Sequence, residues 1–214
     1  MRGRTTPAQR EKELLQRAAR QYRKLPYHNW QHALGAAARG MEIARQCKQE
    51  GKHVNIEVVK WALLFHDAGY HQNHAQKGFK TKEGYSIFLA QREMEKMRFA
   101  PKLINAVGRA IAATHRDASF DTTEAKVVRA ADLAGLAAPY AEFIRNTRNL
   151  KTEFERMHGK KVPWNEWKKQ AAKIIDFYLK QDIHLTPNYE DKNGESIFHR
   201  RARENVRRMI RERK

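Results

Sequence analysis

The sequence predicts an all-α fold of about eight to nine helices in a single domain. Apolar residues recur at three- and four-residue spacing through most of the 214 residues, which is the period of a helix face. Runs that alternate apolar and polar residues between hairpin turns, the pattern of β-strands, are hard to find. The chain has no linker rich in Pro, Gly or Ser and no internal repeat, and its length suits one core.

The predicted helices span about 8–24, 30–49, 55–67, 82–97, 101–115, 123–136, 139–157, 163–181 and 195–212. The side chains of Asn29 and Asn55 stand where they can accept a hydrogen bond from a free amide at the start of the second and third helices. Gly51 and Gly69 follow the ends of the same two helices, where a left-handed residue is favoured. These residues support the boundaries that the apolar spacing indicates.

The later helices have similar support from prolines. Pro101, Pro139 and Pro163 stand at predicted helix starts, where a proline at the first helical position loses no hydrogen bond. The aromatic residues of 163–181 and the apolar residues of 195–212 fall at helical spacing, which indicates packing faces. The longest irregular segments are predicted at 68–81 and 182–194, and the first of them follows the most informative motif.

Charge narrows the class of partners. The chain has 43 Lys and Arg against 24 Asp and Glu, a formal net charge of +19, so its field should attract anions such as nucleotides, nucleic acid or acidic headgroups. Many of these cations are expected simply to be solvated on helix faces.

The single cysteine, Cys47, is expected in the core, and no segment has the roughly 18 apolar residues of a membrane span. We expect a cytoplasmic protein.

The segment VVKWALLFHDAGY, residues 58–70, is an apolar helix that ends in His66-Asp67 before a glycine. Apolar residues cover most of its circumference, so the helix should be buried on nearly all sides. A carboxylate at the end of a buried helix is costly unless a charge neutralises it. An ion pair or a metal ion could do so.

Further ligand-type residues lie in two other apolar contexts. LPYHNWQH, residues 25–32, places His28 and His32 four residues apart, on one face if the helix begins near Asn29. VVRAADLAGLAAPY, residues 127–140, places Asp132 in the middle of another largely apolar helix. Taken one by one these residues are weak evidence, but His, His-Asp and Asp on three apolar helices make a donor set for a divalent cation.

The order His32, His66-Asp67, Asp132 resembles the signature of HD-superfamily phosphohydrolases. The likeness extends to YHNWQH, LLFHDAGY, Glu83, the Thr-His pair at 114–115, ADLAGL at 131–136 and RARENV at 201–206, over roughly residues 15–210. These segments are similar to a bacterial branch described as predicted metal-dependent HD phosphohydrolases. The resemblance implies a helical HD-domain bundle over 1–214, with a metal-site core at about 25–140 and a helical extension at about 141–214.

Two departures from that branch are visible. Thr81-Lys82-Glu83 stands where the branch usually has Asn-Glu-Glu, so one acid is replaced by a cation. Lys151, followed two positions later by Glu153, stands where an arginine of an Arg-x-Glu-Tyr pattern is expected. These changes bear on the substrate more than on the metal.

The resemblance implies a divalent metal ion, Mn, Mg, Fe, Co or Ni, held by His32, His66, Asp67 and Asp132. Such a donor set leaves about two octahedral positions for water and a phosphoryl oxygen. Asp67 would also orient the water, and Glu83 could relay a proton. His115 could contact phosphate or a second metal, or stabilise a helix C-terminus. Further expected contacts to substrate are His28, Lys82, Arg116 and Lys151, with Lys77 and Lys80 steering anions.

The expected activity is hydrolysis of a phosphomonoester or pyrophosphate bond in a nucleotide-type substrate, with an activated water as nucleophile. One alternative is a phosphodiesterase acting on cyclic nucleotides or oligonucleotides. Another is a nucleic-acid-binding or regulatory protein with a structural metal, which the positive charge favours. A di-iron oxygenase would need extra histidine ligands that the spacing does not clearly provide. The sequence leaves the oligomeric state open.

Overall fold

The computed structural model describes residues 6–181, 185 and 196–212, and it confirms the all-α prediction. No β-strand occurs in this part of the chain. The helices are α1 (Pro7–Ala19), α2 (Trp30–Gln49), α3 (Ile56–Phe65), α4 (Lys82–Lys96), α5 (Pro101–Ala112), α6 (Thr123–Asp132), the 3-10 helix η1 (Leu133–Ala137), α7 (Tyr140–His158), α8 (Trp164–Leu179) and α9 (Ile197–Arg211). The predicted loop 182–194 and the predicted start of the last helix at residue 195 lie outside the described residues, apart from Leu185.

The predicted start signals are confirmed at α2 and α3. The side chain of Asn29 accepts hydrogen bonds from the amides of Gln31 and His32 at 2.9 and 3.1 Å, and that of Asn55 caps α3 in the same way. Pro101 is the first residue of α5 as predicted. Pro139 and Pro163 differ from the prediction, because each occupies the cap position, with extended backbone, one residue before its helix.

The first predicted helix, 8–24, was too long, because α1 ends at Ala19. The chain leaves the helix so that Tyr22 can turn inward, where its hydroxyl donates a buried hydrogen bond of 3.1 Å to the carbonyl of Leu64. Pro26 also disfavours helical backbone at Leu25. The segment after α1 therefore approaches the end of α3.

Two other predicted helices end earlier than expected. The guanidinium of Arg129 donates to the carbonyls of Thr114 and His115, so the turn after Ala112 is held outside α5. The predicted helix 123–136 is α6 only to Asp132 and continues as η1. The sequence predicts Asp132 in the middle of its helix, whereas the structure places it at the helix end.

Helices α1 to α6 share one large apolar core. α3 lies inside it, with Val58, Val59 and every residue from Trp61 to Phe65 buried, as the sequence predicts. Cys47 is also buried there. α2 packs on both α3 and α6, and an added Cβ at Gly40 would lie 2.2 Å from Leu63 and 3.3 Å from Ala131. The glycine is what allows α2 to lie so close to these helices.

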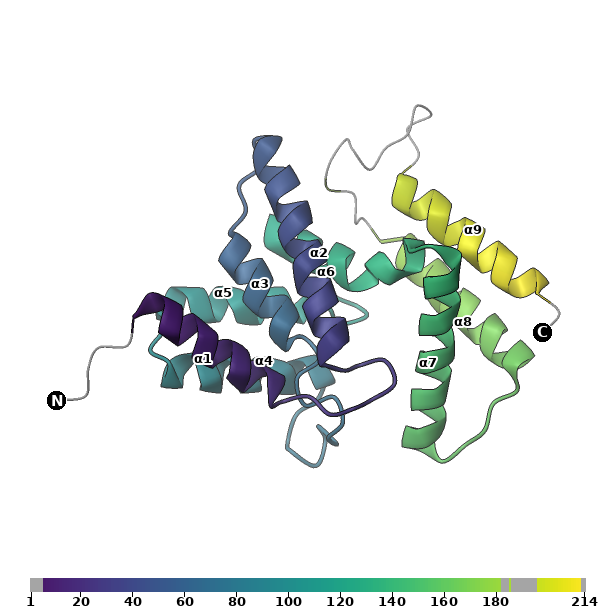
Figure 1. Ribbon diagram of the computed structural model, residues 1–214, viewed down its shortest axis with the longest axis horizontal. Helices are drawn as coiled ribbons and strands as arrows, with labels where there is room; N and C mark the ends of the chain where they lie inside the picture. Colours follow the sequence, from purple (N-terminus) through teal and green to yellow (C-terminus); the bar gives the residue numbers. More distant parts are fainter. Residues whose placement is uncertain (1–5, 182–184, 186–195, 213–214) are drawn as a thin grey trace.

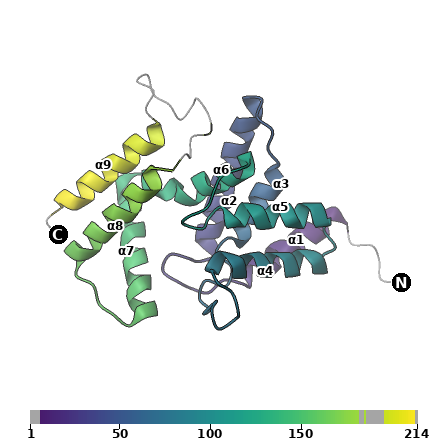
Figure 2. The same cartoon turned by 180° about the vertical axis from the view of Figure 1, so that it is seen from behind.

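Helices α7, α8 and α9 form a second group with its own apolar cluster around Phe143, Ile175 and Met209. Figure 1 shows this group on one side of α6 and helices α1 to α5 on the other, and Figure 2 shows the same separation from behind. η1 follows α6 and packs on α7 and α9, so it joins the two groups. Among the described helices, none has the length and apolar character needed to cross a bilayer.

Candidate metal centre

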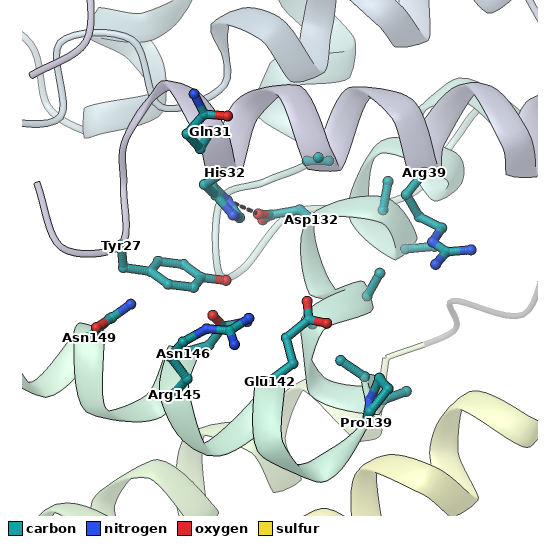
Figure 3. Close-up of a pocket in the computed structure, with 18 of the residues that line it drawn as sticks. Tyr27, Gln31, His32, Arg39, Asp132, Pro139, Glu142, Arg145, Asn146 and Asn149 are labelled. Atoms are coloured by element: carbon teal, nitrogen blue, oxygen red, sulfur yellow. Dashed lines mark ion pairs between the residues drawn. The ribbon is translucent and has the colours of Figure 1, made fainter. Parts of the chain in front are cut away.

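The four predicted metal ligands come together at the ends of three helices. His32 lies in the first turn of α2, His66 and Asp67 directly follow α3, and Asp132 is the last residue of α6. The Nε2 atoms of His32 and His66 are 3.3 Å apart, and Asp132 Oδ1 lies 3.5 and 3.3 Å from them. Asp67 Oδ2 lies 2.9 Å from His66 Nε2 and 3.6 Å from His32 Nε2. Figure 3 shows His32 and Asp132 facing each other.

This spacing suits a divalent ion. Neighbouring ligand atoms in an octahedral shell with bonds of about 2.1 Å lie about 3.0 Å apart, close to the distances found here. His66 Nδ1 is 2.7 Å from the carbonyl of Leu63, which fixes the ring and leaves Nε2 as the ligand atom. Two imidazoles and two carboxylates are a donor set common to several divalent transition metals. The residues present therefore fit a metal ion.

Burial makes the charges of this cluster depend on one another. His66 and Asp67 are about 1% and 2% exposed. Burial alone would lower the pKa of His66, but Asp67 and Asp132 outweigh it and raise that pKa well above its ordinary value. Burial likewise works to raise the pKa of Asp67, but His66 and Lys82 hold it well below the usual range. The two carboxylates therefore stay ionised and favour positive charge beside them, and a metal ion bound at His66 Nε2 would take the place of the proton on that ring.

The turn after Asp67 depends on Gly69. This residue has a φ of 73°, in the left-handed region that the sequence predicts for a helix end. An added Cβ would also lie 2.6 Å from the ring of Tyr85 and 2.8 Å from Leu89. The turn can therefore press against α4 only because the residue is glycine, and this contact places Asp67 beside the start of α4.

Lys82 and Glu83 open α4 next to the cluster, as predicted. Lys82 Nζ lies 3.3 Å from Asp67 Oδ1 and 3.4 Å from Glu83 Oε1. It also lies 5.1 Å from the ring centre of Tyr70. Glu83 is about 4% exposed, so it is not a solvated residue of the first turn. Lys82 therefore bridges two buried carboxylates at the edge of the metal centre.

His28 does not share a helix face with His32, because it precedes the Asn29 cap of α2. Its ring still comes within 6.0 Å of the His32 ring and stacks on Tyr70 at 3.8 Å. His28 Nδ1 is hydrogen-bonded to the buried carboxylate of Glu153. The other Glu153 oxygen accepts from the backbone amides of Tyr27 and His28, both at 2.9 Å. Glu153 of α7 therefore holds the segment that carries His28.

Glu153 leads to a prediction on pH. Burial works to raise its pKa, but the hydrogen bonds from His28 and the two amides outweigh it and keep the pKa below the usual 4.5. A lowered folded-state pKa gives stability that is present above pH 4.5 and lost as pH falls through the lowered value. The wild type should therefore be more stable than Glu153→Gln at neutral pH, and the difference should vanish in acid.

Urea unfolding of both proteins at a series of pH values measures this difference. Glu95→Gln, which removes an exposed carboxylate of α4, controls for the loss of one surface charge. A difference between wild type and Glu153→Gln that grows as pH falls would contradict the role given to Glu153.

The other predicted residues divide into two groups. His115 lies in the turn after α5 and not at the end of the helix, and His115 and Arg116 both line a cavity beside the metal centre. The guanidinium of Arg116 lies 4.5 Å from the ring centre of Phe177. Lys151 binds Glu155 at 2.6 Å and lines neither of the two large cavities. The structure thus brings His115 and Arg116 to the site and leaves Lys151 outside it.

Two large cavities flank the centre. The α9 cavity, of about 610 Å³, is lined by residues of α2, η1, α7 and α9, including His32 and Asp132. The α8 cavity, of about 590 Å³, is lined by α8 and by Asp67, Lys82, Glu83 and His115. Tyr27 and Asp132 line both cavities. A ligand in either one can therefore reach the cluster.

The chain is similar to known proteins in sequence and in fold. A sequence model of the HD domain matches residues 29–134, which contain all four predicted ligands. The fold is similar to the phosphodiesterase domain of the Salpingoeca rosetta rhodopsin phosphodiesterase, with a TM-score of 0.58 and 16% identity over 94% of this chain and 76% of that one. At this identity the similarity concerns the fold. No curated protein matches the chain.

Proposed function

Because residues 29–134 are an HD domain and the chain thus belongs to the HD superfamily, we propose that it is a metal-dependent phosphohydrolase acting on a nucleotide-type substrate. The ligands are His32, His66, Asp67 and Asp132, and the ion is Mn, Mg, Fe, Co or Ni. The observation that carries the proposal is the clustering of His32, His66 and Asp132, with Asp67 beside them, between two cavities that Asp132 lines from both sides. Cavities of this size hold small organic ligands.

A bound ion would supply an acidified water and polarise a phosphoryl oxygen. The chain itself supplies positioning and charge. Asp67 Oδ1 faces Lys82, so this carboxylate is held in one orientation. Lys82 and Arg116 line the α8 cavity, where they can neutralise phosphate. Glu83 lines the same cavity and can accept or return a proton.

One observation favours a phosphodiesterase as the second candidate. Glu153 holds His28 through Nδ1, and Tyr70 stacks on the ring, so Nε2 is left to act in the α8 cavity. A histidine fixed by a carboxylate is suited to protonate the oxygen of a leaving alcohol. Ester oxygens are poor leaving groups without a proton, so this role suits a phosphodiester substrate. The fold itself is similar to that of a phosphodiesterase domain. The experiment below also tests the alternative of a nucleic-acid-binding protein with a structural metal.

The activity test is a matrix of metals and substrates. Protein stripped with a chelator and reloaded with each ion should release phosphate, pyrophosphate or a nucleotide from some member of a panel of nucleotides, cyclic nucleotides and short oligonucleotides. The loaded site must be verified by elemental analysis. Full metal occupancy without turnover on any substrate, combined with tight, salt-sensitive binding of nucleic acid, would replace the enzyme proposal by the binding one.

A further inference from the structure

The two cavities meet at the metal centre from different sides. His32 faces the α9 cavity, Asp67 and Glu83 face the α8 cavity, and Asp132 lines both. A phosphoryl group bound at these residues therefore has open space on two sides. A phosphomonoester would fill only one of them, because its phosphorus has one organic substituent.

The α8 cavity has a charged part and an apolar part. The charged part next to the metal centre is lined by Glu83 and by Lys82, which contacts both Asp67 and Glu83. The wall formed by α8 consists of aliphatic and aromatic side chains, including Trp167 and Ile174. Ile174 is 51% exposed, although it is a large apolar residue. This wall is suited to a planar or apolar group joined to the phosphate.

The α9 cavity offers hydrogen-bonding groups instead. Arg145, Asn146 and Asn149 line it from one helix, and no hydrogen bond or ion pair joins their side chains to another residue in the described part of the chain. Figure 3 shows Arg145 and Asn146 on α7, on the side of the cavity opposite His32 and Asp132. Free amide and guanidinium groups are donors for hydroxyl and phosphate oxygens. This cavity is suited to a sugar.

We propose that the substrate is a phosphodiester with unlike substituents, an aromatic or apolar group in the α8 cavity and a sugar in the α9 cavity. This inference rests on the proposed phosphohydrolase function. In the reaction the oxygen of water bonds to phosphorus and the bond from phosphorus to the aromatic group's oxygen breaks. That oxygen leaves with a proton as the free alcohol, and the sugar keeps the phosphate as a monoester.

Three chromogenic esters test the proposal, because each releases p-nitrophenol. p-Nitrophenyl phosphate has one substituent, bis(p-nitrophenyl) phosphate has two aromatic substituents, and thymidine 5′-p-nitrophenyl phosphate has one aromatic group and one nucleoside. The expected order of kcat/KM places the thymidine diester first, above the bis ester by about tenfold, since two or three added hydrogen bonds are worth that much. The monoester should be the poorest substrate.

Variants of α7 locate the sugar. Arg145→Ala combined with Asn149→Ala should raise KM for the thymidine diester about tenfold, with a much smaller change for the bis ester. Arg148→Ala is the matched control, because Arg148 lies on α7 over Trp164 and lines neither cavity. Equal effects of the double variant on both diesters would overturn the assignment of the α9 cavity.

The outcomes separate this inference from the proposed function. Turnover of the monoester at least as fast as that of both diesters would overturn the inference and leave the phosphohydrolase intact. Absence of turnover on all three esters and on the nucleotide panel, with the metal bound, would overturn the function itself.

Discussion

Asp67→Ala is expected to lose the bound ion and at least about a thousandfold in turnover, or about 4 kcal/mol of transition-state stabilisation. Asp67 is almost fully buried, and Oδ2 contacts both histidine Nε2 atoms while Oδ1 contacts Lys82. Its removal takes away a ligand and leaves Lys82 without one of its two carboxylates. Elemental analysis after dialysis and a turnover assay with the best metal and substrate measure the two losses.

Asp176→Asn is the control for this variant, because Asp176 is an exposed carboxylate on α8 that pairs with Lys180. It should keep both the ion and the activity. Circular dichroism should show that Asp67→Ala remains helical. Full activity of a folded Asp67→Ala protein would show that this carboxylate is not a metal ligand.

Gly40→Ala is expected to destabilise the protein by about 1–3 kcal/mol, although alanine is the better helix former. The new Cβ would lie 2.2 Å from Leu63 Cδ1 and 3.0 Å from Val59 Cγ1, so the fully buried Leu63 side chain must repack or α2 must move away from α3. α2 carries His32, and the end of α3 carries the His-Asp pair. The variant should therefore also hold the metal more weakly, which urea unfolding and a chelator competition assay would measure.

Gly35→Ala is the matched control on the same helix. An added Cβ at Gly35 meets nothing within 4 Å, so only the helix propensity changes. This variant should gain up to about 1 kcal/mol. If the two variants change stability equally, the close packing at Gly40 does not determine how α2 sits on α3.

The clustering of the four candidate ligands could be predicted from the sequence because these residues stand in or next to apolar helices. A carboxylate such as Asp67 next to a buried run needs a neutralising charge, and this need is visible locally. The partner of His28 is not visible in this way. Glu153 lies 125 residues further along the chain, on a helix whose own pattern is that of an ordinary surface element. The resemblance of Lys151 and Glu153 to part of an Arg-x-Glu-Tyr pattern pointed to this helix, where Glu153 contacts the segment of His28 and Lys151 pairs with Glu155.

Helix ends were predicted less well than helices, because distant groups decide them. Arg129 donates hydrogen bonds to the carbonyls of Thr114 and His115, which lie 15 and 14 positions earlier in the chain. These bonds keep the turn at His115 out of α5. Asn205 of α9 donates hydrogen bonds to the carbonyls of Leu136 and Ala138, at the end of the 3-10 helix η1 that follows α6. Such bonds follow from the packing of α9 and α6 on other elements. The two cavities depend on the same packing, so local patterns could not predict them.

The separate apolar clusters of the two helix groups bear on how this protein could change. The four candidate ligands lie on or next to helices of the α1 to α6 core, whereas the cavity walls opposite them come largely from α7, α8 and α9. Substitutions on those walls can alter which molecule binds without repacking the helices that carry the candidate ligands. New specificities could therefore evolve on this scaffold while the candidate ligands stay in place, provided that the two links between the helix groups are preserved. These links are η1 and the contact of Glu153 with the backbone of Tyr27 and His28.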